Sequence, residues 1–358
     1  TQRLEEILKK VHKEKLNTIP GEEIFKLYDT YGFPTDLVEE TAKDAGLVLD
    51  MEGYTRAMNE QKTKAMTSWK GSGEKEVAPF YKEFLQSSPP TVFEGYEHTQ
   101  GQGKVLAILK NQTPVNTACT GDEIEFLTDR TPFYGESGGQ KGDSGLASNE
   151  SVRLSLDDTT KPLPGLIVHK AKIISGTLCN GESLTLEVNR QTRGNTTLNH
   201  SATHLLQATL KEVLGEHIKQ AGSLVASDRL RFDYTHFSPL TDKERVRIES
   251  RVNEKIRDNI QVDTQEMDVD TAIKNGAVAL FGEKYGDTVR VVDVPGFSKE
   301  LCGGTHVTAT GDIGMFRITS EGGIASGVRR IEAVTGATAY NTIQADQESL
   351  TAIRGLLK

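Results

Sequence analysis

The hydrophobic period of the chain changes after Pro89 and Pro90, and this change limits the folds available to it. Upstream, apolar residues recur at helical spacing, as in LEEILKKV. Downstream, runs such as KVLAILK, VRLSLDD and LTLEV alternate apolar and polar residues and are separated by glycine-rich turns, which is typical of antiparallel strands. Because these runs are short and numerous, we expect a small β-barrel over residues 89–190.

A helical period returns at Arg190, where a long helix begins, and a charged helix is expected over residues 242–259. Strands and glycine-rich loops surround these helices, which indicates a two-layer α+β domain. We therefore predict an α+β multidomain chain, with Gly71-Ser72-Gly73 as the flexible point of its linker. Its expected parts are a helical segment and linker over residues 1–75, the barrel over 89–190, the α+β domain over 191–336 and the start of a C-terminal helix over 337–358.

The composition is that of a globular chain, with 36% hydrophobic and 26% charged residues in 358. No apolar run approaches the roughly 20 residues that cross a bilayer, and no secretory signal is recognisable, so we expect a cytoplasmic protein without a membrane partner. The net charge of −9 is the wrong sign for coating nucleic acid by bulk charge, so RNA binding requires local basic patches. Since the chain begins at Thr1 inside a helical pattern, we expect it to be excised from a longer protein.

Four side chains that can bind a metal occur in two short-spaced pairs. His200 and His204 are four residues apart in NHSATHLLQATL, so a helix places both on one face. Cys302 and His306 have the same spacing in LCGGTH, where two glycines allow a tight loop. One N,N pair and one S,N pair suit tetrahedral Zn²⁺ better than Mg²⁺ or Ca²⁺, so we predict one zinc ion per chain. The alternative is that Cys302 is a small buried apolar residue and His306 a hydrogen-bonded loop residue.

Thr203 and Gln207 extend the polar stripe of His200 and His204 along the same helix face. A polar stripe on an otherwise apolar helix is costly to bury unless it is used. Thr203, Gln207 and Cys302 are therefore the candidate catalytic residues. Gln207 either orients a water molecule or the scissile ester, or it holds the tautomer of a histidine.

The candidate substrate contacts are Ser223, Gly303, Gly304, Arg329 and Arg330. For Ser223, a plain turn or strand serine is the alternative. Arg329 and Arg330 follow a glycine-rich loop suited to a close phosphate approach, although Arg330 could instead pair with Glu332. The glycines of ESGGQ, at residues 136–140, are expected to form a hairpin turn.

Taken together, NHSATHLLQATL and ELCGGTH resemble the two-part zinc signature of the alanyl-tRNA synthetase editing domain. The segment TPFYGESGGQKGDSG (131–145) is similar to the glycine-rich loop of the barrel that precedes that domain, and GGIASGVRRIEAVTG (322–336) to its closing segment. The segment FKLYDTYGFPTDL (25–37) is similar to the end of the tRNA-recognition helices of that family. The resemblance covers essentially the whole chain.

This resemblance implies an aminoacyl-tRNA deacylase that uses zinc to hydrolyse serine or glycine from the 3′ end of tRNA(Ala). It also implies a monomeric piece without the adenylate-forming core, so that ATP would serve only the absent core. Zinc would polarise the ester carbonyl, activate water or hold the amine or hydroxyl of the substrate, and the residues alone do not choose among these roles. Two alternative hypotheses are a non-catalytic tRNA-binding module whose fold is stabilised by zinc, and the related editing domain of a threonyl-tRNA synthetase.

Overall fold

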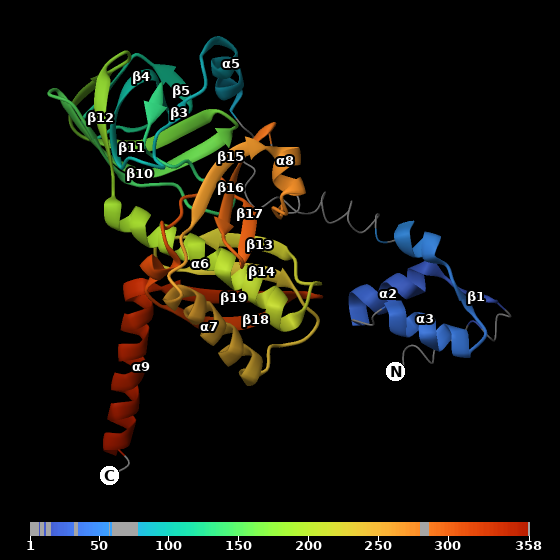
Figure 1. Cartoon of the computed structure of the whole chain (residues 1–358). Coiled ribbons are helices and arrows are strands. Elements are labelled where there is room, and N and C mark those ends of the chain that lie inside the picture. Colours follow the sequence, from blue (N-terminus) through green and yellow to red (C-terminus); the bar gives the residue numbers. More distant parts are fainter. Residues whose placement is uncertain are drawn as a thin grey trace. The chain divides into compact units, whose positions relative to one another are not determined.

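The computed structural model describes residues 7, 11, 16–31, 35–56, 58, 78–279 and 286–356 (Figure 1). The chain divides into two compact units, Thr1–Glu76 and Val77–Lys358. The predicted flexible point at residues 71–73 lies outside the described residues. The finer domain bounds expected from the sequence stay predictions.

The first unit is mainly helical, as its hydrophobic period predicts. Its elements are β1 (Thr18–Ile19), α2 (Gly21–Tyr31), α3 (Thr35–Asp44) and β2 (Val48–Leu49), and β1 pairs with β2 in parallel. Ile19, Ile24, Leu27 and Val38 are among the residues of its small apolar core. Because this core is separate from those of the second unit, the unit has its own hydrophobic centre.

The second unit begins with a closed antiparallel barrel of six strands. The barrel strands are β4 (Gln100–Lys110), β7 (Glu123–Thr128), β9 (Gly145–Ser148), β10 (Val152–Leu163), β11 (Leu166–Cys179) and β12 (Ser183–Val188). They neighbour one another in the order β10-β9-β12-β4-β7-β11, and a further pairing of β10 with β11 closes the ring. The apolar residues of the alternating runs fill the interior, with Phe126, Leu154 and Leu186 fully buried. The predicted barrel is confirmed.

Short elements decorate this barrel. Helix α5 (Pro79–Ser87) packs on it through Tyr81. Strand β3 (Val92–Phe93) pairs in parallel with β8 (Arg130–Thr131), β5 (Thr113–Val115) pairs with β4, and β6 (Thr117–Cys119) pairs with β11. The β3–β8 pair lies beside the start of the next domain, where the cavity described below is found.

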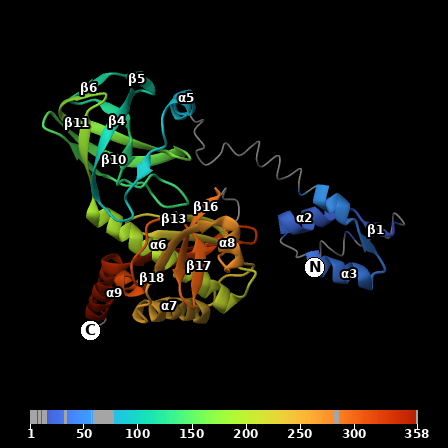
Figure 2. The same cartoon turned by 45° about the horizontal axis from the view of Figure 1, so that its top comes forward.

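The remainder of the second unit is a two-layer α+β arrangement. Helices α6 (Arg190–Leu214) and α7 (Asp242–Arg257) cover one face of a four-stranded sheet ordered β13-β14-β19-β18 (Figures 1 and 2). These strands are β13 (Gln220–Val225), β14 (Leu230–Thr235), β18 (Phe316–Ala325) and β19 (Val328–Thr335). A second sheet consists of β15 (Asp263–Asp268), β16 (Thr288–Val294) and β17 (Ser298–Leu301), with α8 (Val269–Lys274) beside it and η1 (Thr310–Ile313) following. Helix α9 (Gly336–Leu356) continues from β19 and is largely exposed.

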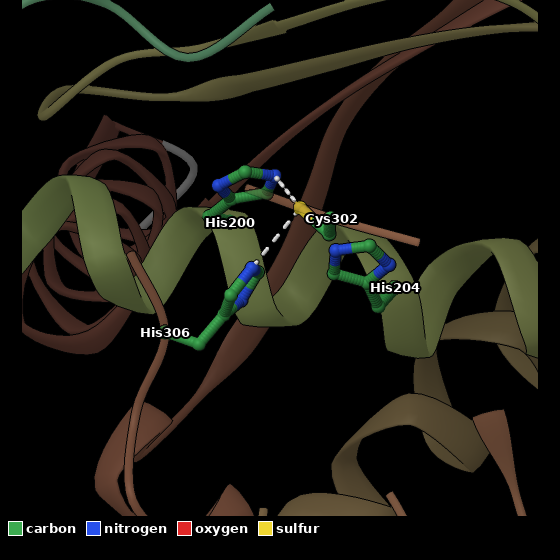
Figure 3. Close-up of side chains that lie close together, drawn as sticks. All are labelled: His200, His204, Cys302 and His306. Carbon is green, nitrogen blue, oxygen red and sulfur yellow. Dashed lines mark hydrogen bonds between the residues drawn. The ribbon is translucent and has the colours of Figure 1, made fainter. Parts of the chain in front are cut away.

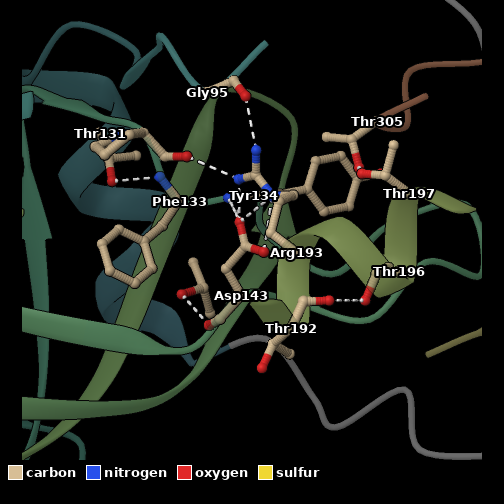
Figure 4. A network of polar contacts seen from close by, with 12 residues as sticks. Gly95, Thr131, Phe133, Tyr134, Asp143, Thr192, Arg193, Thr196, Thr197 and Thr305 are labelled. Carbon is tan, nitrogen blue, oxygen red and sulfur yellow. Dashed lines mark hydrogen bonds and ion pairs between the residues drawn. The ribbon is translucent and has the colours of Figure 1, made fainter. Parts of the chain in front are cut away.

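A buried ion pair joins α6 to the barrel (Figure 4). The guanidinium of Arg193, in the first turn of α6, donates from Nε to both carboxylate oxygens of Asp143 at 2.9 and 3.0 Å, and from Nη2 to the same carboxylate. Its remaining donors reach the carbonyl oxygens of Gly95 at 2.7 Å and Pro132 at 2.9 Å. Arg193 is 6% and Asp143 4% exposed. The start of α6 is therefore held against the barrel by a buried charge whose three nitrogens each have a hydrogen-bond acceptor.

Replacing Asp143 by Ala should lower the free energy of unfolding by about 3–5 kcal/mol, because the Arg193 guanidinium would stay buried without a counter-charge. Urea unfolding of the variant measures this loss. The control is Glu136→Ala, which removes a solvent-exposed pair with Lys141 and should cost less than about 1 kcal/mol. Equal losses in the two variants would contradict the anchoring role of the pair.

A second buried titratable group lies inside the barrel. His169 is 0% exposed, and its Nδ1 and Nε2 atoms lie 3.2 Å from the Phe126 carbonyl oxygen and 2.8 Å from Thr131 Oγ1. Burial lowers the pKa of His169 to about 4, and the hydrogen bond to Phe126 only partly opposes this. The unfolded chain, with a pKa of about 6.5 at this position, binds more protons between these two pH values. The free energy that neutral His169 contributes to the folded state is therefore fully present above the unfolded pKa of about 6.5. It is lost as the pH falls from there towards the folded pKa of about 4.

We predict that the buried, neutral His169 lowers the free energy of unfolding by up to about 3 kcal/mol when the pH falls from 6.5 to 4. The measurement compares urea unfolding of the parent and of His169→Gln at several pH values across the window. The variant should show a shallower pH dependence, and parallel curves for the two proteins would refute the assignment.

Candidate metal centre

The four predicted metal ligands converge (Figure 3). His200 and His204 project from α6, and Cys302 and His306 belong to the loop that follows β17. One potential ligand atom from each residue lies within 4.8 Å of those of the other three. Cys302 Sγ is 3.4 Å from His200 Nε2 and 3.2 Å from His306 Nε2. Two segments that are distant in the sequence thus form one N₃S cluster.

The second ring nitrogen of each histidine has a separate partner. Gln140 Oε1 lies 2.7 Å from Nδ1 of His200, Glu300 Oε2 lies 2.7 Å from Nδ1 of His204, and Ser201 Oγ lies 3.2 Å from Nδ1 of His306. Such contacts orient the ring and leave Nε2 free as a ligand. His204 Nε2 is buried and has no hydrogen-bond partner among the described residues. A buried nitrogen left without a partner beside a thiol and two imidazoles fits a soft or borderline metal ion.

The electrostatics of the cluster favour the forms that bind a metal. Burial alone would raise the pKa of the Cys302 thiol, but His200, His306 and His204 hold it well below its usual range. Burial lowers the pKa of His306 to about 3, which keeps its imidazole neutral. For His204, burial is outweighed by the Glu300 carboxylate and Cys302, which raise its pKa. A thiolate and a neutral imidazole are ligands, and positive charge beside Glu300 is stabilised whether a proton or a metal ion carries it.

A cavity of about 310 Å³ opens beside the cluster. The structure places most of the predicted site residues on its wall. They are His200, Thr203, His204 and Gln207 from α6, Ser223 from β13, and Cys302, Gly303 and Gly304 from the loop of residues 302–306, which we call the ligand loop. The opposite wall comes from the barrel and from strand ends, with Phe93, Tyr96, Tyr134, Lys161, Gln220 and Glu266 among its residues. Side chains of two domains therefore enclose one polar cavity.

The ligand loop is held in place from outside. Tyr96 Oη donates to the Gly303 carbonyl at 2.7 Å, and Arg290 Nη1 donates to the Gly304 carbonyl at 2.8 Å. The Arg290 guanidinium also lies over the Tyr96 ring, 4.1 Å from its centroid. A Cβ atom at Gly304 would overlap the His200 ring, so only glycine allows the loop to approach α6 this closely.

Arg329 and Arg330 lie elsewhere. Arg329 pairs with Glu321, with Nη2 at 2.8 Å from Oε2, and Arg330 pairs with Asp233 through two contacts of 2.7 and 2.9 Å. Neither arginine lines the cavity. The expectation that Arg330 could pair with Glu332 is wrong, because the register of β14 and β19 places Asp233 directly opposite Arg330. Any contact of these arginines with RNA stays a prediction.

Several residues of the site were not anticipated. Gln140 is the last residue of the ESGGQ turn, where Gly138 and Gly139 have φ of 56° and 81° as the predicted turn requires. Its carboxamide reaches across the domain boundary, since Nε2 donates to Thr305 Oγ1 at 3.0 Å while Oε1 contacts His200. Glu300 precedes Cys302 by two residues, a spacing that could have marked it as a partner for the cluster. No sequence pattern around Tyr96 or Arg290 indicates that these residues contact the loop of the site.

Comparison with known proteins identifies the family. Residues 1–192 match the family "tRNA synthetases class II (A)", and residues 289–332 match the "Threonyl and Alanyl tRNA synthetase second additional domain". The chain is 49% identical to an alanine–tRNA ligase of Desulfosudis oleivorans over 96% of this chain and 39% of that protein. It is 49% identical to one of Xanthomonas axonopodis pv. citri over 98% of this chain and 40% of that protein. The chain thus spans about two fifths of the length of these relatives.

The matched class is that of the class II tRNA synthetases. Within this class the chain belongs to the alanyl-tRNA synthetase family, and it includes the additional domain that this family shares with threonyl-tRNA synthetases. In the described part of the chain, helices long enough to cross a bilayer are not apolar enough to do so.

We expect the purified chain to bind about one zinc ion, because its N₃S donor set suits that metal. The double variant His200→Ala/His204→Ala should lose most of it in elemental analysis. The matched control is His217→Ala/His236→Ala, which removes a pair of contacting histidines outside the cluster and should retain zinc. A parent chain without any transition metal, or undiminished zinc in the first double variant, would contradict the ligand set.

Proposed function

We propose that this chain hydrolyses the ester bond of mischarged tRNA(Ala), releasing serine or glycine from its 3′ end. The observation that carries this proposal is the N₃S cluster on the wall of a polar cavity of about 310 Å³. The match to the additional domain of threonyl and alanyl tRNA synthetases supports it. In the whole protein, which we propose acts in the cytoplasm, this activity would accompany the ATP-dependent ligation of alanine to tRNA(Ala).

Hydrolysis of mischarged tRNA compensates for the limited ability of a synthetase site to distinguish similar amino acids. A site that accepts alanine cannot strongly reject serine, because serine only adds a hydroxyl, and discrimination of this kind reaches about a hundredfold. A second site that removes the wrong amino acid after transfer overcomes the limit. The second site must then prefer the substrate with the hydroxyl, which requires polar groups aimed into its cavity.

The polar groups on the cavity wall can take up these tasks. Zinc, held by His200, His204, Cys302 and His306, would supply Lewis-acid polarisation of the ester or a more acidic water molecule. Gln140 and Glu300 keep two of the imidazoles oriented. Thr203 Oγ1 already donates to the Asn199 carbonyl at 2.8 Å, so its oxygen is left to accept a hydrogen bond from the substrate. Gln207 can donate and accept at once, which suits a residue that positions water against the ester.

The second candidate function is a non-catalytic tRNA-binding module in which zinc stabilises the fold. The complement of four protein ligands favours it, because such sites are usually closed and structural. Hydrolysis requires instead that one ligand be loosely held or that a further coordination position be open. Treatment with a chelator separates the two candidates, since a structural ion should unfold the domain when it leaves, whereas a catalytic ion should stop turnover while the fold stands.

Replacing Cys302 by Ala should reduce both zinc content and hydrolysis of Ser-tRNA(Ala). Replacing Gln207 by Ala should leave zinc bound but slow hydrolysis roughly tenfold or more, because Gln207 positions reactants and is not a ligand. Single-turnover release of serine, with metal content measured in each variant, checks both expectations.

The matched control is Gln191→Ala, which removes an exposed carboxamide from the first turn of the same helix and should behave as the parent. If Cys302→Ala and Gln207→Ala both hydrolyse Ser-tRNA(Ala) at the parental rate while folded, the cavity is not the hydrolytic site and the structural role of zinc is preferred.

A further inference from the structure

Two charged side chains line the cavity, apart from its histidines and Cys302. Lys161 is the only lysine or arginine on the wall within the described ranges, and Glu266 is the only carboxylate there. Both are exposed, and neither forms an ion pair with another described residue. One cation and one anion therefore face the same cavity, and neither has an ion-pair partner among the described residues.

Lys161 comes from the barrel. It lies near the end of β10, beside the glycine-rich loop, where a Cβ atom at Gly135 would be 3.0 Å from Lys161 Cβ. The rings of Phe93 and Tyr134 line the cavity from the same domain, with centroids 5.9 Å apart. The barrel wall thus combines an apolar aromatic surface with one cation, the combination that proteins use to bind a nucleotide through its base and phosphate.

Glu266 comes from β15 in the other domain. Its cross-strand partner is Arg290, whose guanidinium donates to the Gly304 carbonyl and lies over the Tyr96 ring. The carboxylate is close enough to Tyr96 to influence its phenol, whose pKa is raised mainly by burial and in part by Glu266. Within the described part of the chain, Glu266 is therefore an anion without an ion pair near the loop that carries Cys302 and His306.

We propose that the cavity recognises an aminoacyl nucleotide by both of its charges, with Lys161 binding the phosphate that precedes the terminal nucleoside and Glu266 binding the free α-ammonium. This inference rests on the proposed function, because an aminoacyl ester at an RNA 3′ end carries these two charges on either side of the scissile bond. Hydrogen bonds in which one partner is charged are stronger than hydrogen bonds between neutral groups. It follows that the site prefers esters with a free amine over N-acylated ones.

The phosphate contact is tested by binding, without turnover. The probe is a short RNA that ends in CCA and carries serine through a non-hydrolysable amide at its 3′ end. Lys161→Ala should weaken binding roughly tenfold and should reduce the slope of log affinity against log salt by about 0.7. Lys172→Ala removes an exposed lysine of β11 that does not line the cavity, and it should leave both quantities unchanged.

The ammonium contact is tested with the same probe and its N-acetylated form. The parent should bind the free amine roughly tenfold more tightly than the acetylated form, and Glu266→Gln should abolish this preference. Asp263→Asn, at an exposed position of β15 that does not line the cavity, should retain it.

Parental affinity and salt slope in Lys161→Ala, or a parental preference in Glu266→Gln, would overturn the corresponding contact. These outcomes differ from failure of the proposed function, in which the parent chain itself would not release serine from Ser-tRNA(Ala).

Discussion

The arrangement of the site depends on where α6 is held. Arg193 fastens the first turn of this helix to the barrel through Asp143 and two backbone carbonyls, and His200 follows about two helical turns later. Because one rigid helix carries both the anchor and two of the four residues of the cluster, the barrel and the cluster have a defined spacing. Gln140 can then reach from the barrel to His200 within hydrogen-bond distance. A buried charge that is costly to leave unpaired thus sets the position of the cluster relative to the barrel.

Residues of two domains line the cavity, and each domain contributes different groups. Helix α6 and the ligand loop supply the cluster and the polar stripe of Thr203 and Gln207, which face the position proposed for the ester. The barrel supplies an aromatic wall and Lys161, and it also supports the loop through Tyr96. Neither domain encloses the cavity alone, so loss of the contact between them should affect the proposed binding of substrate and of metal together.

Local patterns predicted the helices, the barrel and the ligand spacing, because hydrophobic period and an i, i+4 pair are properties of a few consecutive residues. The contacts that join distant segments were not predictable in this way. Arg330 pairs with Asp233 rather than Glu332 because of strand register. Arg193 lies three residues after the predicted helix start at Arg190, and only the structure shows that it anchors α6 to the barrel. Gln140 looked like the last residue of a turn, and only the packing of the barrel against α6 gives it a histidine to orient.

Zinc-dependent hydrolysis is tested most directly by titrating zinc into the metal-free chain and following single-turnover release of serine from Ser-tRNA(Ala). If the cluster is the hydrolytic centre, the rate should rise with zinc and reach its plateau at one ion per chain, while Ala-tRNA(Ala) stays largely intact throughout. A metal-free, folded chain that releases serine at the full rate would contradict this. So would a zinc-loaded chain that hydrolyses serine and alanine esters equally.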